Sequence, residues 1–281
     1  MTRIAIIGDV HGRWADEDVS WFNQSDYDHI LFVGDLAGSR HSGVLKIVAR
    51  IARLTTPTLL MPGNHDAIHL LQMGAEIAGT PGLGRPFVRG NHRKLDEIVA
   101  ALSPHTLAAW SLHPIDQDTA IVAGRPHSFG GPGFSFADFL SERWGIATLD
   151  QSIDRMRALI DQAPERILFL GHNGPAGLGA GRADIWGCDF KREGGDWGDR
   201  DLRAAIDYAR DSGRTVLAVA AGHMHHDLKG GGQRPWTVTD DIGTIHVNAA
   251  QVPRIRDRKH HHVRMIIDGD AVSVETVQVA R

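Results

Sequence analysis

The sequence contains only one cysteine, Cys188, among its 281 residues. A lone cysteine cannot form an intramolecular disulfide, and a thiolate metal cluster needs several cysteines. We therefore expect the reducing cytoplasm to be the location of this protein.

Long apolar runs are also missing. No stretch approaches the roughly 20 apolar residues that a membrane-spanning helix requires. The first strand-like run, residues 4–7, stops at Gly8 and Asp9, which is too early for the hydrophobic region of a signal peptide. We thus expect neither a membrane span nor a secretory leader.

The chain has no excess of positive charge: 30 Lys and Arg residues stand against 34 Asp and Glu residues, a net charge of −4. This balance provides no overall attraction to nucleic acid or to an anionic membrane. Histidine, in contrast, is abundant, with 17 residues. Because histidine is the commonest metal ligand, the positions of these residues become the main question.

Five short apolar runs share one pattern: each is strand-like and is followed by glycine or proline and then by a polar residue. The runs are residues 4–7, 30–33, 58–61, 167–170 and 216–221. They lack polar alternation, which is typical of strands covered on both faces in layered α/β proteins. Ligands of such proteins bind beyond the carboxyl ends of the strands, so the five ends predict one shared cleft.

The rest of the chain predicts helices between these strands and a different ending. Helical periodicity occupies residues 44–54, 149–163 and 200–212. Three further strand-like segments, residues 244–249, 263–267 and 272–279, are joined by tight turns, which predicts an antiparallel sheet that closes the fold. Residues 79–90, 125–133 and 174–198 are expected to be irregular. Since no linker or solenoid repeat is present, we predict a single domain over residues 1–281.

Seven candidate metal ligands follow the five runs. They are Asp9, His11, Asp35, Asn64, His172, His223 and His225. The Asp-x-His and His-x-His spacings place two donors on the same side of an extended strand end. Seven oxygen and nitrogen donors that share one bridging carboxylate can complete two coordination shells and leave room for water. The set therefore predicts two divalent metal ions rather than one structural zinc.

The same segments resemble the signature motifs of the calcineurin-like metallophosphoesterase superfamily. The motifs are Asp9-Val10-His11, Gly34-Asp35, Gly63-Asn64-His65-Asp66, Gly171-His172 and Gly222-His223-Met224-His225. The resemblance implies an α/β fold, classed as α+β in some schemes: a four-layer α/β/β/α sandwich with two central mixed sheets. It implies one metal held by Asp9, His11, Asp35 and His225. A second metal would be held by Asp35, Asn64, His172 and His223, with Asp35 as the bridge.

A narrower resemblance covers the second half of the chain. Residues 172–179, 194–199, 223–226 and 248–254 resemble a subgroup of this superfamily typical of cyanobacteria and plastids. The chain departs from phosphoprotein phosphatases, which continue the second motif as Gly-Asp-x-x-Asp-Arg-Gly and have Glu after the third-motif His. Here Leu36-Ala37-Gly38-Ser39-Arg40 follows Asp35, and Asp66 follows His65. This departure argues against a protein phosphatase.

The chemistry expected of such a site is phosphoester hydrolysis. Two metal ions about 3.5 to 4 Å apart can lower the pKa of a bridging water, so that a bridging hydroxide attacks phosphorus in line. The leaving group then needs a proton, and we assign that role to His65. Asp66 is expected to hold the His65 ring and to support its protonated form, as the resemblance also implies.

Substrate contacts are expected from arginine, because a guanidinium group fits a phosphate. Of Arg13, Arg40, Arg125 and Arg182, which lie near the motif loops, Arg125 is our candidate because it ends a strand and opens a glycine-rich turn. The loop 174–199 is expected to form the wall that selects the leaving group. Its tryptophans, Trp186 and Trp197, are expected to pack beneath it, with stacking on a leaving group as the alternative.

The remaining histidines and cations have ordinary interpretations. His226 could contact substrate or lie in an exposed loop, and His260, His261 and His262 are expected to enter a strand. Eight others are expected at the surface or in caps: His29, His41, His69, His92, His105, His113, His127 and His246. The basic run 254–259 is expected to be a solvated edge, although clustered cations can also contact a phosphate backbone.

The leading hypothesis is a metal-dependent phosphomonoesterase that acts on a small cytoplasmic phosphate ester. The alternatives are a phosphodiesterase for small molecules or cyclic nucleotides, a nuclease of the same superfamily, and a non-catalytic scaffold. Manganese, iron, zinc and nickel all accept these ligands, and manganese is favoured. The expected partner is a small phosphorylated substrate, without nucleic acid or membrane, and the sequence does not indicate an oligomeric state.

Overall fold

The computed structural model describes residues 1–38 and 41–280, in which two mixed sheets form the centre of the molecule. The first sheet has the order β11-β12-β1-β2-β3-β4, with β13 also paired to β12. Its strands are β1 (Thr2–Ile7), β2 (His29–Phe32), β3 (Thr58–Leu60), β4 (Thr106–Leu107), β11 (Ile255–Arg256), β12 (Lys259–Asp268) and β13 (Ala271–Ala280). Strands β1 to β4 are parallel, whereas β12 runs antiparallel to β1 and β13.

The second sheet has the order β5-β6-β7-β8-β10-β9. Its strands are β5 (Ser111–Pro114), β6 (Thr119–Ala123), β7 (Arg166–Leu170), β8 (Thr215–Ala221), β9 (Thr237–Thr239) and β10 (Ile245–Asn248). The four inner strands are parallel, and the edge strands β5 and β9 are antiparallel to their neighbours.

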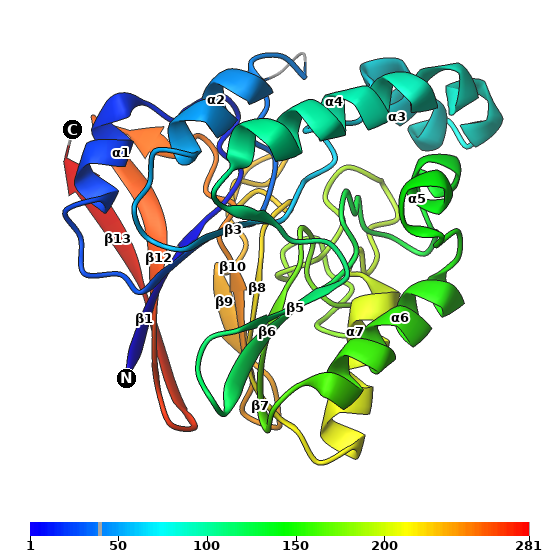
Figure 1. Ribbon diagram of the computed structural model, residues 1–281. Helices are drawn as coiled ribbons and strands as arrows, with labels where there is room; N and C mark the ends of the chain where they lie inside the picture. Colours follow the sequence, from blue (N-terminus) through cyan, green and yellow to red (C-terminus); the bar gives the residue numbers. More distant parts are fainter. Residues whose placement is uncertain (39–40, 281) are drawn as a thin grey trace.

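Helices cover the outer faces of the two sheets (Figure 1). They are α1 (Asp16–Phe22), α2 (Val44–Ile51), α3 (Leu70–Ile77), the 3₁₀ helix η1 (Pro81–Phe87), α4 (Val88–Leu102), α5 (Ala137–Trp144), α6 (Leu149–Gln162) and α7 (Arg200–Asp211). Helices α1, α2 and α4 lie beside the first sheet, and α6 and α7 lie beside the second. This is the predicted four-layer α/β/β/α arrangement. None of the helices formed by the described residues is long and apolar enough to cross a membrane.

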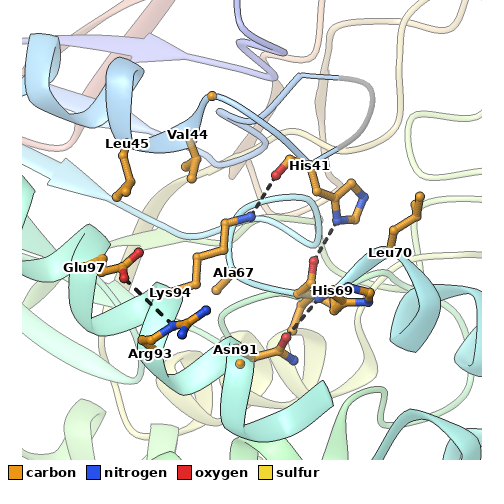
Figure 2. A pocket seen from close by; sticks show the side chains of 13 residues that line it. His41, Val44, Leu45, Ala67, His69, Leu70, Asn91, Arg93, Lys94 and Glu97 are labelled. Carbon is orange, nitrogen blue, oxygen red and sulfur yellow. Dashed lines mark hydrogen bonds and ion pairs between the residues drawn. The ribbon is translucent and has the colours of Figure 1, made fainter. Parts of the chain in front are cut away.

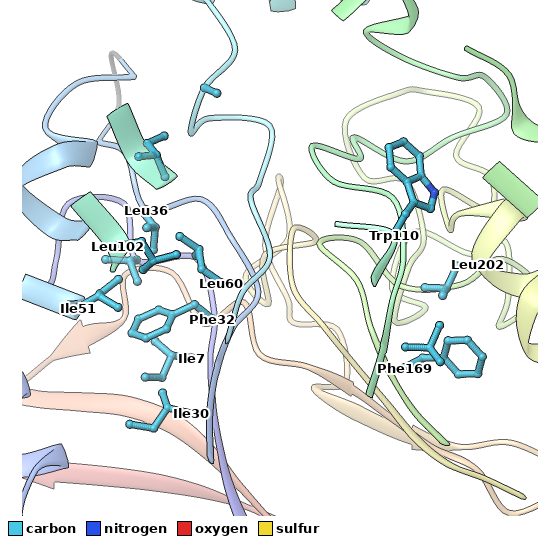
Figure 3. Packing of buried hydrophobic residues seen from close by; sticks show 14 of the residues in the cluster. Ile7, Ile30, Phe32, Leu36, Ile51, Leu60, Leu102, Trp110, Phe169 and Leu202 are labelled. Atoms are coloured by element: carbon cyan, nitrogen blue, oxygen red, sulfur yellow. The ribbon is translucent and has the colours of Figure 1, made fainter. Parts of the chain in front are cut away.

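The absence of polar alternation in the strands has a simple packing cause. In β1, Ala5 and Ile7 pack under the helices, whereas Ile4 and Ile6 pack between the two sheets. Figure 3 shows Ile7 on the helix side of the first sheet and Phe169 of β7 on the helix side of the second. Because both faces of each inner strand are buried, both sets of alternating side chains must be apolar.

Two sequence-based expectations about the fold are wrong. Residues 79–90, expected to be irregular, form η1 and the start of α4. Residues 244–249, expected in a closing antiparallel sheet, include β10, which is parallel to β8. Both errors come from relying on local sequence alone. The glycines and prolines of η1 are typical of loops and so conceal a 3₁₀ helix. The direction of a strand depends on its partner, which can be distant in the sequence.

Candidate metal centre

The loops after β1, β2, β3, β7 and β8 meet at the carboxyl ends of the strands, as predicted, and carry the seven candidate ligands. Four of these residues have left-handed backbone conformations: φ is 35° at Asp9, 44° at His11, 53° at Asp35 and 69° at His223. Non-glycine residues rarely adopt positive φ, and such residues concentrate at functional sites. The chain thus turns sharply where each strand ends and directs these side chains into one cleft.

Glycines allow the loops to approach so closely. A Cβ atom on Gly34 would lie 2.6 Å from Nδ1 of His172, and one on Gly222 would lie 2.5 Å from Oδ1 of Asp9. Any side chain at these two positions would displace a candidate ligand. The glycines that precede Asp35, Asn64 and His223 therefore make room for ligands from other strands.

The first group of ligands consists of Asp9, His11 and His225, whose donor atoms all lie within 4.8 Å of one another. Nε2 of His225 is 3.2 Å from Oδ2 of Asp9 and 3.2 Å from Nε2 of His11. Oδ2 of Asp9 is buried and makes no hydrogen bond of good geometry with the described residues. A buried carboxylate oxygen without a hydrogen-bond donor, facing two imidazole nitrogens, fits a divalent cation.

The second group consists of Asp35, His172 and His223, with donor atoms again within 4.8 Å of one another. Nε2 of His172 lies 3.4 Å from Oδ1 of Asp35 and 2.9 Å from Oδ1 of Asn64. The other carboxylate oxygen of Asp35, Oδ2, lies 4.0 Å from Nε2 of His11 in the first group. Asp35 is therefore the carboxylate that faces both groups.

Backbone carbonyl groups fix the tautomers of two ligands. Nδ1 of His172 donates a hydrogen bond to the Val33 carbonyl oxygen at 2.6 Å, and Nδ1 of His11 lies 3.3 Å from the Ala37 carbonyl oxygen. A neutral ring that donates through Nδ1 keeps the Nε2 lone pair for a metal. In both rings Nε2 is the atom that points into the cleft.

The electrostatics of the cleft favour ionised carboxylates and a neutral His223. Burial alone would raise the pKa of Asp35, but the imidazoles of His172, His65 and His11 hold it well below the usual range. Burial lowers the pKa of His223 to about 3. Burial also acts to lower the pKa of His172, yet the charge of Asp35 raises it above the usual value. An unprotonated imidazole beside ionised carboxylates is the form in which these groups bind a cation.

Comparison with known proteins agrees with this geometry. The family model described as calcineurin-like phosphoesterase matches residues 2–227. The chain belongs to this family. It is a phosphoester hydrolase with two candidate groups of metal ligands. A comparison with curated protein sequences found no match.

Solved structures share the fold of this phosphoesterase at low sequence identity. A dimetal phosphatase from Danio rerio matches with a TM-score of 0.56 and 11% identity, covering 99% of this chain and 98% of that one. A protein from Thermus thermophilus matches with a TM-score of 0.54 and 12% identity, covering 98% of each chain. Likeness at this level of identity extends to the fold alone.

His65, the candidate acid, lies at the edge of the two ligand groups in this phosphoesterase. Its Nε2 is 3.9 Å from Oδ2 of Asp35, and its ring meets the His11 ring edge-on, with centroids 5.3 Å apart. Burial lowers the pKa of His65. On its other side the ring packs against His41, with centroids 4.4 Å apart.

Asp66 does not hold the His65 ring by a hydrogen bond, although its charge acts to raise the pKa of His65. Its carboxylate accepts hydrogen bonds from the backbone N–H groups of Asp35, Leu36, Ala37 and Gly63, at 3.0, 2.7, 3.2 and 2.7 Å. None of these bonds reaches the His65 ring, whose buried Nδ1 makes no hydrogen bond with the described residues. Asp66 instead joins the loop after β2 to the loop after β3, and so positions Asp35.

The expected contact between Arg125 and substrate does not fit the structure. Arg125 is only 3% exposed, and its guanidinium group forms ion pairs with Asp199 at 2.9 Å and Asp201 at 3.0 Å. Asp199 also accepts a hydrogen bond from Ser128. A guanidinium group that is buried between two carboxylates cannot reach a phosphate in the cleft. Arg125 therefore joins the loop before α7 to the end of β6. Arg40, another arginine considered above, lies outside the described residues.

The tryptophans of the long loop pack beneath it, as expected: Trp186 is 1% and Trp197 is 9% exposed. The aromatic ring at the cleft is instead Phe190, which is 41% exposed. Phe190 and Lys229 line a cavity of about 210 Å³ together with Asp35, His65, His223 and His225. Sequence reasoning missed both residues, because a single Phe or Lys in a glycine-rich loop carries no pattern.

Two histidines expected at the surface or in caps are buried near the ligands. His127 is fully buried and its Nδ1 donates to the Gly63 carbonyl oxygen at 2.7 Å. His41 donates from Nδ1 to the Ile68 carbonyl oxygen, and its own carbonyl accepts from Lys94, as Figure 2 shows. The cavity of about 400 Å³ in that figure is lined by His41 and by residues of α2 and α4, but by none of the seven candidate ligands. It is therefore not the metal centre.

Proposed function

We propose that this phosphoesterase is a metal-dependent phosphomonoesterase that acts on a small phosphate ester. The observation that carries the proposal is the position of Asp35, which faces both ligand groups and also lies beside His65. Two divalent ions, with manganese favoured, would be held by Asp9, His11 and His225 and by Asn64, His172 and His223, with Asp35 between them. When bound, such ions neutralise phosphoryl charge and lower the pKa of water.

His65 would act on the leaving group. Its Nε2 lies 3.9 Å from Oδ2 of Asp35, and the side chain is 24% exposed, so it can contact a ligand in the cleft. Burial lowers its pKa in the free protein, but a bound phosphate brings negative charge that favours the imidazolium form. The Nε2 proton can then pass to the leaving oxygen as its bond to phosphorus breaks.

The mouth of the cleft supports a small ester over a polyanion. Lys229 can contact a phosphate oxygen, and the exposed ring of Phe190 can contact an apolar part of the leaving group. Asp189 and Asp227 line the same cavity. These two carboxylates are each paired with an arginine, and the chain has a net charge of −4, so the mouth offers little attraction to a nucleic acid backbone.

The test is a panel of substrates assayed with the manganese-loaded protein. We expect hydrolysis of an aryl phosphate and of small alkyl phosphates, with much lower kcat/KM for a bis-aryl diester, a cyclic nucleotide and single-stranded DNA. A higher kcat/KM for the diester would favour the phosphodiesterase alternative. Failure to bind two metal ions, together with no activity on any ester, would favour a scaffold.

Four further predictions from the sequence accompany this proposal. A cytoplasmic location and membership of a subgroup typical of cyanobacteria and plastids stay predictions. So do the single-domain organisation and the identity of the metals.

A further inference from the structure

A second cavity, of about 220 Å³, adjoins the metal centre near β12 and β13. His226, Arg234, Trp236, Arg256, His261 and Thr276 are among its lining residues. Three of them come from features that the proposed function leaves unused: the histidine after the His-x-His pair, the basic run 254–259 and the histidine triplet 260–262. The fold therefore brings these separate features to one place.

The side chains around this cavity offer N–H donors that have no partner within residues 1–38 and 41–280. Arg256 uses only one terminal nitrogen, Nη2, which bonds Asp227 at 2.6 Å and the Val252 carbonyl oxygen at 2.9 Å. Its Nε is buried and makes no hydrogen bond with the described residues. Nε2 of His261 is also buried without a hydrogen bond, and the tautomer of this neutral ring decides whether it donates or accepts. The indole N–H of Trp236 makes no hydrogen bond with the described residues. A buried N–H group such as Nε of Arg256 requires an acceptor, and the half-buried indole of Trp236 can supply a second donor.

Charge is divided between the two cavities. Arg256 pairs with Asp227, and Arg234 lies 3.4 Å from Asp189. Both arginines line the second cavity, whereas both carboxylates line the cavity of the metal centre. The second cavity thus has cationic walls without a carboxylate among its lining residues. Burial is the main reason why the pKa of His261 is lowered to about 3, and the charges of Arg254 and Arg256 act in the same direction, which reflects the positive surroundings of this side chain.

We propose that this cavity binds a small oxyanion of the size of phosphate. Arg256 and Trp236 would donate hydrogen bonds to it, and Arg234 would contribute charge from a fixed position. Arg234 is fixed because its Nε donates to the carbonyl oxygen of His225, and its Nη1 donates to the carbonyl oxygens of Asp184 and Gly187. An anion in the cavity would therefore contact the residue that supports a candidate metal ligand. The anion could be free phosphate or a second acidic group of the substrate.

Thr276 provides a test that removes no hydrogen bond between described side chains. This residue of β13 is exposed, lines the cavity and makes no side-chain hydrogen bond with the described residues. Thr276→Glu would place a carboxylate beside the site, and Thr276→Gln is the neutral control of nearly the same size. The midpoint of thermal unfolding is measured for the full chain in increasing inorganic phosphate at constant ionic strength, with manganese and again after chelation.

We expect phosphate to raise the unfolding midpoint of wild type and Thr276→Gln alike, whereas Thr276→Glu should need about tenfold more phosphate for the same shift. The difference should persist after chelation, so phosphate bound at the metal centre cannot cause it. Arg256→Gln should weaken the effect of phosphate, and Arg258→Gln, an exposed arginine outside the cavity, should not. Equal phosphate dependence in Thr276→Glu and Thr276→Gln would overturn the proposal.

The two sources of the anion are separated by kinetics. If the site holds a second acidic group of the substrate, Thr276→Glu should raise KM for a phosphate ester that carries such a group and leave KM for a plain aryl phosphate unchanged. If it holds free phosphate, KM should be unchanged for both esters, while the phosphate-induced shift of the unfolding midpoint is still weakened. Since the unfolding measurement needs no turnover, its result stands even if the proposed hydrolysis is wrong.

Discussion

Nε2 of His11 and Nε2 of His225 lie 3.2 Å apart, although 214 positions separate the two residues in the sequence. The Nδ1 atom of His11 faces the Ala37 carbonyl oxygen, so its Nε2 carries a lone pair directed at the other ring. These two nitrogens and the buried Oδ2 of Asp9 can therefore bind the same cation.

Replacing His225 should remove one metal ion. We expect His225→Asn to bind about one equivalent of manganese in place of two and to lose about a hundredfold or more in kcat/KM, because a direct ligand is lost. Metal content after dialysis and the kinetics of aryl phosphate hydrolysis measure both effects. His92→Asn, at a histidine that pairs with Glu142 on the surface, is the control and should retain two equivalents.

His65 should matter for the leaving group and not for metal content. We expect His65→Asn to retain two metal ions and to reduce kcat for an alkyl phosphate by about 10²- to 10⁴-fold, the usual contribution of a general acid. An aryl phosphate, whose leaving group needs no proton, should lose far less. Equal losses for the two esters would remove His65 from the role of acid.

Asp66 should contribute to stability through the backbone. Asp66→Asn replaces an acceptor of four backbone N–H groups by an amide whose own N–H₂ group would face these donors. We expect a loss of about 3 kcal/mol in the free energy of unfolding, since hydrogen bonds to a buried charged group are lost. Urea unfolding measures it. A fall in kcat with unchanged stability would instead support the expected action of Asp66 on the His65 ring.

Arg125 should also be a structural residue. Arg125→Gln leaves Asp199 and Asp201 buried without their cation, so we expect a loss of about 3 to 5 kcal/mol in the free energy of unfolding. The folded fraction should keep its KM. Arg93→Gln, at a side chain that is 82% exposed, is the control and should leave stability nearly unchanged. A large rise in KM without a loss of stability would restore Arg125 as a substrate contact.

One ion pair should give a measurable pH dependence of stability. Burial acts to raise the pKa of Asp240, but hydrogen bonds from Arg210 and His246 lower it to about 2. A carboxylate with a lowered pKa stabilises the folded state above its unfolded pKa, and this contribution is lost as the pH falls through the folded pKa. We expect Asp240→Asn to cost about 1 kcal/mol at pH 7, because solvent screens part of the interaction. The difference from wild type should shrink as the pH falls from about 4 towards 2. A difference that is constant with pH would exclude this origin.

Local patterns were enough to locate the predicted strands that end at the cleft, because strands buried on both faces leave long apolar runs and the turns after them need glycine. Ile4 to Ile7 and Ile167 to Leu170 are such runs. Helices α3 and α4 and the strand β5 were not predicted, and β6 was expected only as the strand that precedes Arg125. Local sequence also could not predict the direction of β10, since its parallel partner β8 lies more than twenty residues earlier in the chain.

The sequence by itself determined which residues can bind metal, because donor atoms and the spacing of a motif are properties of residue type and order. Only the tertiary structure decided what the neighbouring charges do. Arg125 and Asp66 are each next to a cleft loop in sequence, yet burial pairs the first with two carboxylates and the second with four backbone N–H groups. A buried charge must be satisfied by whatever groups the fold brings within hydrogen-bonding distance, and residues far apart in the chain supply those groups.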